Sequence, residues 1–189
     1  MGKAAAISCV KRGGKVLIAS RSEEKLAKAA KEIQSHAPYS TSSTSPERQD
    51  SVVETAVLDA TDEEAVINFV ATKMTVTTES RSSKEDLRTT DWNGLVVSAA
   101  GKAPHGPMAD LPTGSTRELF ESKFWSAYHC AKHIGPKLKT GGGIVFVAGV
   151  LNRRPGMNCA PLASTNGALE GLTRALALEW GPDLRVNCL

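Results

Sequence analysis

The sequence lacks any long apolar run. No stretch of its 189 residues approaches the ~20 apolar residues that a membrane-spanning helix needs. The apolar segment at 4–10 is too short for a signal peptide with its cleavage site. Ala6 stands where a myristoylation signal beginning at Gly2 would need Ser or Thr. We therefore expect no membrane partner and a cytoplasmic location, with an organelle matrix as the alternative.

Clustered charge and clustered metal ligands are also scarce. The formal net charge is +3, and lysines and arginines are spread along the chain, so the basic patch of a nucleic-acid-binding protein is absent. The four cysteines form no C-x-x-C pair, which favours reduced thiols. His129 and His133 would share a helical face, but two imidazoles alone are weak evidence for a metal. We expect no nucleic-acid partner and no metal.

What is present is the composition of a globular protein. Hydrophobic residues make up 41% of the chain and charged residues 23%, and the length fits a single domain over 1–189. Two polar segments, at about 35–50 and 75–90, show no apolar periodicity from which a packed element could be built. They predict two insertions that loop out of the domain.

The apolar pattern alternates between strand-like and helical spacing along the rest of the chain. Five strands are predicted, at about 16–20, 52–58, 94–99 and 144–149, with a fifth beginning at 185–189. The runs Leu95–Val97 and Ile144–Val147 are unbroken, which favours strands covered on both faces. This alternation predicts an α/β fold with a doubly wound parallel sheet.

Helices are predicted between these strands. Ser20 and Thr61 each open an S/T-x-x-E pattern, which is typical of a capped helix start. Two long helices follow, at about 116–139 and 162–180. The second has large apolar residues on one face and small residues on another. A further helix, in the same subunit or across a dimer axis, is therefore expected to pack closely against it.

Three stretches carry a family resemblance: "GKAAAISCVKRGGKVLIASRSEEKLAKAAKEI", "LVVSAAG" and "NGALEGLTRALALEWGPDLRVN". In order and spacing they resemble the short-chain dehydrogenase/reductase family over nearly the whole chain. The resemblance implies a Rossmann-type sheet that binds a nicotinamide dinucleotide at the carboxyl ends of its strands. It also implies a homodimer or homotetramer formed through the helices at 116–139 and 162–180.

The resemblance further implies an incomplete fold. Of the family's glycine-rich turn, T-G-x-x-x-G-x-G, only the final glycine has a counterpart, as Gly2. The first strand before that turn and the elements after the last visible strand have none. We expect a truncated gene model, a fragment or a decayed copy. Without the central first strand, the edges of the strands at 16–20 and 94–99 would be unpaired.

The cofactor positions that the resemblance implies favour NADP(H) over NAD(H). NAD-preferring members end the second strand with an acid, whereas this chain has Ser20 followed by Arg21, whose guanidinium suits a 2′-phosphate. The alternative for Arg21 is an exposed residue in the first turn of a helix. Asp59, with Ala60 beside it, matches the family's adenine-contacting acid.

A second cofactor segment stands in place of the family's N-N-A-G. It consists of Ser98, Ala99, Ala100 and Gly101, whose small side chains leave room for a ribose although the two amides are gone.

All four catalytic positions that the resemblance implies carry other residues. The family transfers a proton through a tyrosine, whose pKa is lowered by a lysine four residues later, and a serine holds the substrate. The tyrosine position is Leu162 and the lysine position, also a cofactor contact, is Asn166. The serine position is Gly149, and the supporting asparagine is replaced by Lys123. Leucine cannot donate a proton and glycine has no side chain, so the mechanism is expected to be impaired.

Several interpretations remain open at this stage. The chain could be an NADP(H)-binding oxidoreductase homologue for a small carbonyl or hydroxyl substrate, with Lys123 as proton donor, anion clamp or plain surface lysine. It could instead be a pseudoenzyme that serves as a nucleotide-binding or oligomeric scaffold, or a fragment without function. Arg153 and Arg154 could hold an acidic substrate or belong to an ordinary solvated loop.

Overall fold

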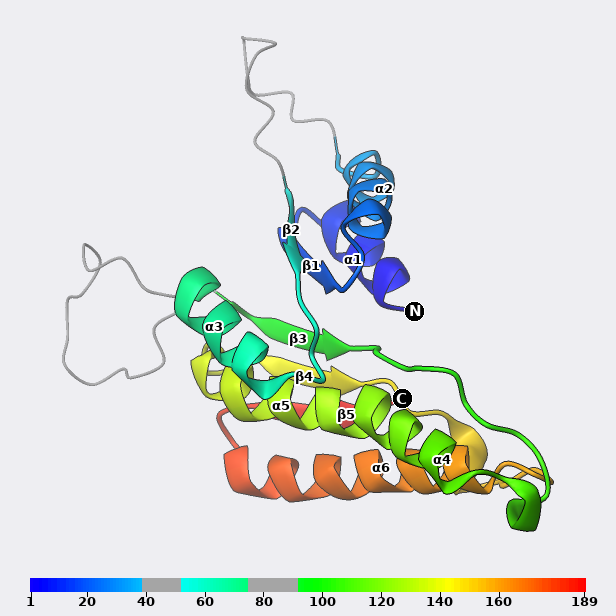
Figure 1. Ribbon diagram of the computed structural model, residues 1–189. Coiled ribbons are helices and arrows are strands. Elements are labelled where there is room, and N and C mark those ends of the chain that lie inside the picture. Colours follow the sequence, from blue (N-terminus) through cyan, green and yellow to red (C-terminus); the bar gives the residue numbers. More distant parts are fainter. Residues whose placement is uncertain (39–51, 75–91) are drawn as a thin grey trace, which may run out of the picture. The chain divides into compact units, whose positions relative to one another are not determined.

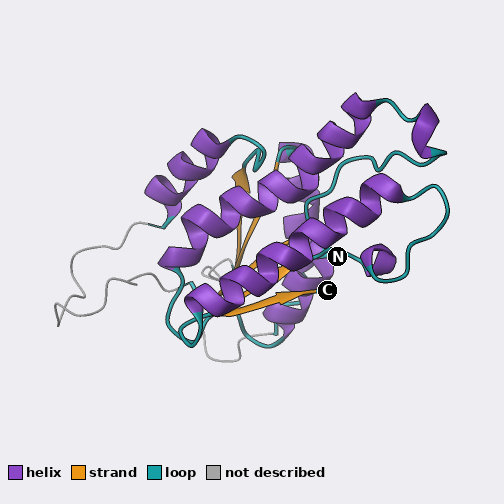
Figure 2. Ribbon diagram, turned by 90° about the horizontal axis from the view of Figure 1, so that it is seen from below, coloured by secondary structure: helices purple, strands orange, loops and turns teal. Residues whose placement is uncertain are grey.

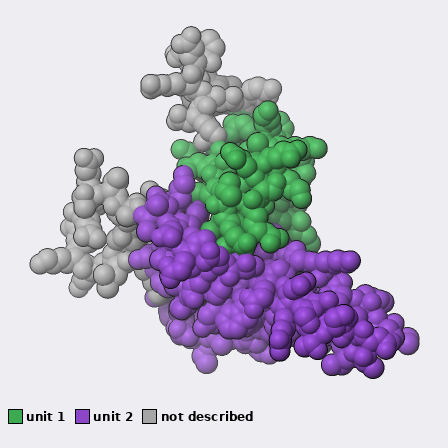
Figure 3. Space-filling model, viewed as in Figure 1, with its two compact units in different colours: residues 1–59 green, residues 60–189 purple. Residues whose placement is uncertain are grey.

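The computed structural model describes residues 1–38, 52–74 and 92–189 (Figure 1). They form two compact units, residues 1–59 and residues 60–189, which Figure 3 shows in different colours. The insertion expected at 75–90 lies outside the described residues, as does most of the one expected at 35–50. The single nucleotide-binding domain over 1–189 stays a prediction.

The described residues of the first unit form two helices and two strands. In chain order they are α1 (Gly2–Lys11), β1 (Val16–Ser20), α2 (Glu23–Gln34) and β2 (Val53–Val57). The strands are parallel, with Val16 opposite Val53. Val10 of α1, Ile33 of α2 and Val53 are buried together and form the centre of this unit's core.

In the second unit, the part that the structure describes forms three strands and four longer helices. In chain order they are α3 (Glu63–Lys73), β3 (Gly94–Val97), α4 (Thr113–Phe120), α5 (Ser126–Ile134), β4 (Gly143–Phe146), α6 (Ala160–Trp180) and β5 (Arg185–Cys188). The strands are parallel in the order β3-β4-β5. In the described ranges, no helix has the length and apolar character needed to cross a membrane.

The five strands form two small sheets instead of one. Within the described residues, β1 pairs only with β2, and β3 pairs only with β4. One edge of β1 and one edge of β3 are therefore unpaired, as expected for the strands at 16–20 and 94–99. The result is a Rossmann-like α/β fold with parallel strands, consistent with the incomplete doubly wound sheet that the sequence predicts.

Within the second unit, the described helices pack against one face of the sheet, and the expectation of strands covered on both faces stays a prediction. Every strand residue in its apolar core belongs to the same face, including Ile144, Phe146 and Val186. On the opposite face Val96 is 47% exposed, and Arg185 and Asn187 are exposed. Figure 2 shows the helices of this unit in front of its strands. Run length alone could not reveal this alternation, because valine fits both environments.

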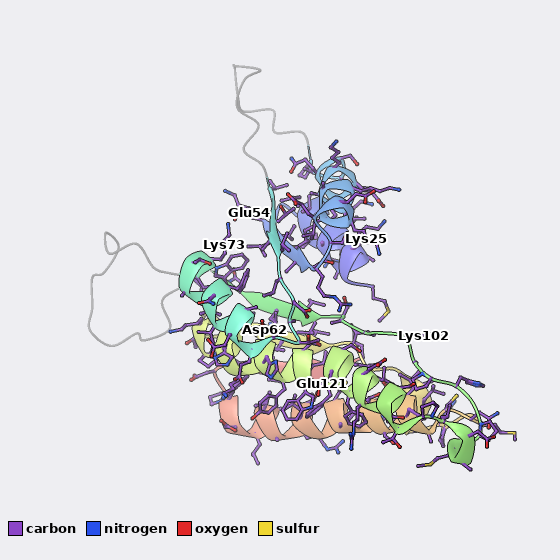
Figure 4. The ribbon with its side chains drawn as sticks, in the orientation of Figure 1. Lys25, Glu54, Asp62, Lys73, Lys102 and Glu121 are labelled. Carbon is purple, nitrogen blue, oxygen red and sulfur yellow. The ribbon has the colours of Figure 1, made fainter. Side chains whose placement is uncertain are left out.

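Both predicted helix caps are displaced from the expected residue. Ser22, not Ser20, caps α2, and its Oγ accepts a hydrogen bond from Lys25 N (3.3 Å). Asp62, labelled in Figure 4, caps α3 in place of Thr61, with Oδ1 accepting from Ala65 N (3.2 Å). Ser20 stays in β1 because its carbonyl accepts from Leu58 N at the end of the sheet. Pairing between strands thus decides where α2 can begin.

The helix predicted at 116–139 is interrupted. Between α4 and α5 lies one π-helical turn, Glu121–Trp125, and a short 3-10 turn, Gly135–Lys137, follows α5. A π turn widens the helix locally and is frequent at functional sites. It contains Ser122 and Lys123, the residues from which the candidate site is built. The helix predicted at 162–180 is present as α6.

Candidate active site

A hydrogen bond joins the segment after β3 to the π turn. Gly101 N donates a hydrogen bond to Ser122 Oγ (2.9 Å). A Cβ at position 101 would lie 2.5 Å from that oxygen, so this close approach requires glycine. Ser98, Ala99 and Ala100 precede it and are exposed. The small residues expected beside a ribose therefore lie open to solvent at the carboxyl end of β3.

Lys123 is buried, which excludes the interpretation as a plain surface lysine. It is 5% exposed, and its Nζ donates to the carbonyl oxygen of Ala148, just after β4 (2.7 Å). Burial disfavours the charged ammonium and lowers the pKa of Lys123, while the nearby Cys188 acts weakly in the opposite direction. The π turn thus holds the chain beyond β3 through Ser122 and the chain beyond β4 through Lys123.

Gly149 has a backbone that only glycine adopts readily. Its φ is 125° and its ψ is 170°, and a Cβ there would lie 3.2 Å from Asn166 Nδ2. The N–H groups of Ala148 and Gly149 both donate to Leu189 O, which fixes the turn. A serine at 149 would be strained in this backbone, so the local structure disfavours the hydroxyl that the family has at this position.

Asn166 lies in the N-terminal half of α6 and is 1% exposed. Its Oδ1 has no hydrogen-bond partner among the described residues. A buried amide oxygen without a partner is costly and needs an explanation, such as a water or a bound hydroxyl. Leu162, one turn earlier on α6, is partly buried and adds no polar group.

Lysine and asparagine have exchanged positions relative to the family pattern. The resemblance places an asparagine at 123 and a lysine at 166, whereas this chain has Lys123 and Asn166. Both side chains approach the turn at Ala148 and Gly149, from the π turn and from α6 respectively. The site keeps one ammonium and one carboxamide, but in the described structure Gly149 and Leu162 supply no hydroxyl to it.

The first unit holds the other predicted cofactor residues. Arg21 and Asp59 form an ion pair of 3.9 Å at the ends of β1 and β2, with side chains 68% and 42% exposed. An exposed pair at this distance contributes little to stability, so the guanidinium is free to turn toward another anion. Ser20 is the last residue of β1, and Gly2 is the first residue of α1. Ala60 begins the second unit.

The two histidines make separate contacts. His129 Nδ1 lies 3.2 Å from Ala60 O, and His133 Nε2 lies 2.8 Å from Glu63 Oε1. Lys132 Nζ reaches the same carboxylate oxygen (2.7 Å). These bonds, that from Lys132 foremost, lower the pKa of Glu63 to about 2. The cluster ties α3 to α5, and no group of three or more metal-ligating side chains occurs in the ranges that the structure describes.

Arg153 pairs with Glu170, a residue that the sequence did not indicate as part of a site. Its Nε donates to Glu170 Oε1 (2.6 Å) on α6. Glu170 also forms an ion pair with Arg174 (3.4 Å). A hydrogen bond from Asn152 is the main cause that lowers the pKa of the Glu170 carboxyl, and the two arginines lower it further. The two partners are 17 positions apart and in different elements, so no local pattern predicts the pair. Both arginines are exposed, and Arg153 is paired with Glu170 of α6.

Parallel strands joined through helices, with small and polar residues gathered beyond their carboxyl ends, define a protein of the Rossmann-like α/β class. A family model described as short chain dehydrogenase matches residues 1–189. The chain belongs to the short-chain dehydrogenase family.

Named relatives agree with this assignment. A chloroplastic tropinone reductase homolog of Arabidopsis thaliana is 31% identical over 98 residues, which are 50% of this chain and 30% of the relative. Gluconate 5-dehydrogenase of Gluconobacter oxydans is 29% identical over 142 residues, which are 71% of this chain and 49% of that enzyme. The matches thus span about half the length of these relatives or less.

A solved small-chain dehydrogenase in complex with NADPH is also similar. It superposes with a TM-score of 0.63 at 27% sequence identity, covering 93% of this chain and 68% of that structure.

Proposed function

We propose that this protein is an NADP(H)-binding oxidoreductase homologue, of the carbonyl and hydroxyl substrate class, in which the family's proton transfer is impaired. The observation that carries the proposal is the backbone of Gly149, whose φ of 125° is unfavourable for a serine. Leu162 offers no acidic proton in place of the tyrosine, and Asn166 offers no cation in place of the lysine. General acid–base catalysis contributes ~10²–10⁴-fold to rate, so its loss leaves binding with slow hydride transfer at most.

The residues of each unit fit parts of a nicotinamide dinucleotide. Arg21 is exposed and weakly paired, which suits a 2′-phosphate that would replace Asp59 as its partner. In the second unit, Asn166 Oδ1 is buried and unpaired among the described residues, which suits a hydroxyl donor. The small residues Ser98 to Gly101 would leave space for a ribose beside it. The similar solved structure that contains NADPH supports a nucleotide of this kind.

A titration tests the cofactor preference. NADPH and NADH are titrated into the full chain, followed by nucleotide fluorescence, for the parent and for Arg21→Ala. We expect tighter binding of NADPH and a loss of that preference in the variant. Because the side chain of Arg21 is 68% exposed, its removal should change stability by no more than ~0.5 kcal/mol. Equal affinities in the parent, or an unchanged ratio in Arg21→Ala, would rule out the phosphate clamp.

A scaffold function is the second candidate, and exposed apolar side chains favour it. Trp125 is 39% exposed and Tyr128 37% exposed on the helices at 116–139, and Leu178 on α6 is 86% exposed. A homodimer or homotetramer through these helices would cover them. Sedimentation that gives only a monomer at micromolar concentration would refute this assembly. A cytoplasmic location, with an organelle matrix as the alternative, stays a prediction.

A further inference from the structure

The amine of Lys123 has an unusual environment for a lysine. Every other lysine of the described residues is exposed, whereas Lys123 is 5% exposed. Among those residues its hydrogen-bond acceptor is a neutral backbone oxygen, and no carboxylate forms an ion pair with it. A buried ammonium without a counter-charge is unfavourable, because desolvation is not compensated. Such an amine gives up its proton more readily than a solvated one.

The amine is nevertheless close to an exposed part of the chain. Nζ is one hydrogen bond from Ala148, and the next residue, Gly149, is exposed and carries no side chain. Leu162 and Gly149 place no carboxylate in the site. Burial of Lys123 outweighs the opposing effect of the Cys188 thiol on its pKa. A desolvated lysine of this kind is a usual form of an activated amine nucleophile.

We propose that Lys123 is a covalent site for small aldehydes and ketones, which its amine binds as an imine. The carbonyl substrate class rests on the proposed function, but the covalent step does not require the nucleotide. The family pattern has an asparagine at position 123, which cannot form an imine. The reaction would therefore depend on the lysine that this chain has there instead.

The step balances without any oxidant or reductant. Neutral Nζ attacks the carbonyl carbon, and the π electron pair moves to the oxygen, which takes a proton from water. The nitrogen of the resulting carbinolamine then loses one proton. The hydroxyl group takes up a proton and leaves as water while the nitrogen lone pair forms the C=N bond, and the nitrogen finally releases its second proton. One amine and one carbonyl compound therefore give one imine and one water. Asn166 Oδ1, buried and without a partner in the described structure, is an acceptor available to the carbinolamine hydroxyl.

Reductive trapping tests the proposal. The full chain is incubated near neutral pH with propanal and cyanoborohydride, digested, and each lysine-containing peptide is quantified by mass spectrometry. We expect Lys123 to acquire a propyl group faster than any exposed lysine. In denaturant this preference should disappear, because all lysines then titrate alike. Lys123 that stays unmodified, or reacts no faster than the exposed lysines, overturns the proposal.

Two variants serve as controls. Lys123→Arg keeps a cation and a donor for Ala148 O but removes the nucleophile, so the fast-reacting site should be lost. Lys102→Arg, which changes one of the exposed lysines labelled in Figure 4, should leave labelling of Lys123 unchanged. If Lys123→Arg does not fold, the comparison between lysines in the parent still decides. NADPH binding is measured separately, so failure to label Lys123 and failure to bind nucleotide are distinct results.

Discussion

Polar residues at the strand ends differ between the two units in their exposure and in their hydrogen bonds. In the first unit, Arg21 and Asp59 are exposed and joined by a long ion pair. In the second, Lys123 and Asn166 are buried, and Ser122 and Lys123 bind backbone groups beyond β3 and β4. Substitutions in the first unit should therefore change ligand binding with little effect on folding, whereas those in the second should change stability first.

The largest effect on stability is expected at Gly149. Gly149→Ala forces a side chain into a backbone with φ of 125° and places Cβ 3.2 Å from Asn166 Nδ2. We expect the free energy of unfolding to fall by about 1–3 kcal/mol, measured by urea denaturation.

Gly141→Ala is the matched control for Gly149. Gly141 also has a positive φ, 83°, but an added Cβ would meet nothing within 4 Å. Its substitution should cost less, on the order of 1 kcal/mol. A Gly149→Ala variant that is as stable as Gly141→Ala would mean that the crowding at Asn166 is relieved without cost.

The next effect concerns the bond between the π turn and the segment after β3. Ser122→Ala leaves the part-buried N–H of Gly101 without its acceptor. We expect a loss of about 1–2 kcal/mol in the free energy of unfolding. Ser164→Ala is the control, because that exposed hydroxyl bonds only to a carbonyl of its own helix. Equal stability of the two variants would show that the bond to Gly101 does not hold the strand end.

The smallest effect is expected at Glu63, which is partly exposed and joins α3 to α5. Its pKa is lowered from 4.5 to about 2, so its contribution to stability is fully present above about pH 4.5 and is lost as the pH falls toward 2. Glu63→Gln should be less stable than the parent at neutral pH, and the two stabilities should converge through that window. A difference that stays constant from neutral pH to pH 2 would exclude this ion cluster as its cause.

The sequence predicts the elements better than their connections. Apolar periodicity locates β1 and α6 nearly to the residue, because it reflects the local backbone. It gives no sign of the π turn at Glu121–Trp125, since one additional residue in a helical turn leaves the apolar pattern almost unchanged. It likewise does not reveal that the helices of the second unit share one face of the sheet, which depends on long-range packing.

The candidate site was predictable in part, and through the family resemblance alone. That resemblance selects Lys123, Gly149 and Asn166, and the structure brings all three to the turn after β4. Neither the burial of Lys123 nor the unpaired oxygen of Asn166 could be foreseen, because each depends on residues far away in the sequence. The partnership of Arg153 with Glu170 was missed for the same reason.

The proposed function requires that the chain binds nucleotide but lacks the acid for carbonyl reduction. The most direct measurement is NADPH oxidation with a panel of aldehydes and ketones, for the parent and for Leu162→Tyr/Asn166→Lys. Gly149 is left unchanged because of its backbone. We expect very slow turnover by the parent and a clear increase in the double variant, of up to the ~10²–10⁴-fold that general acid catalysis supplies. Brisk turnover by the parent, with no gain in the variant, would contradict the account.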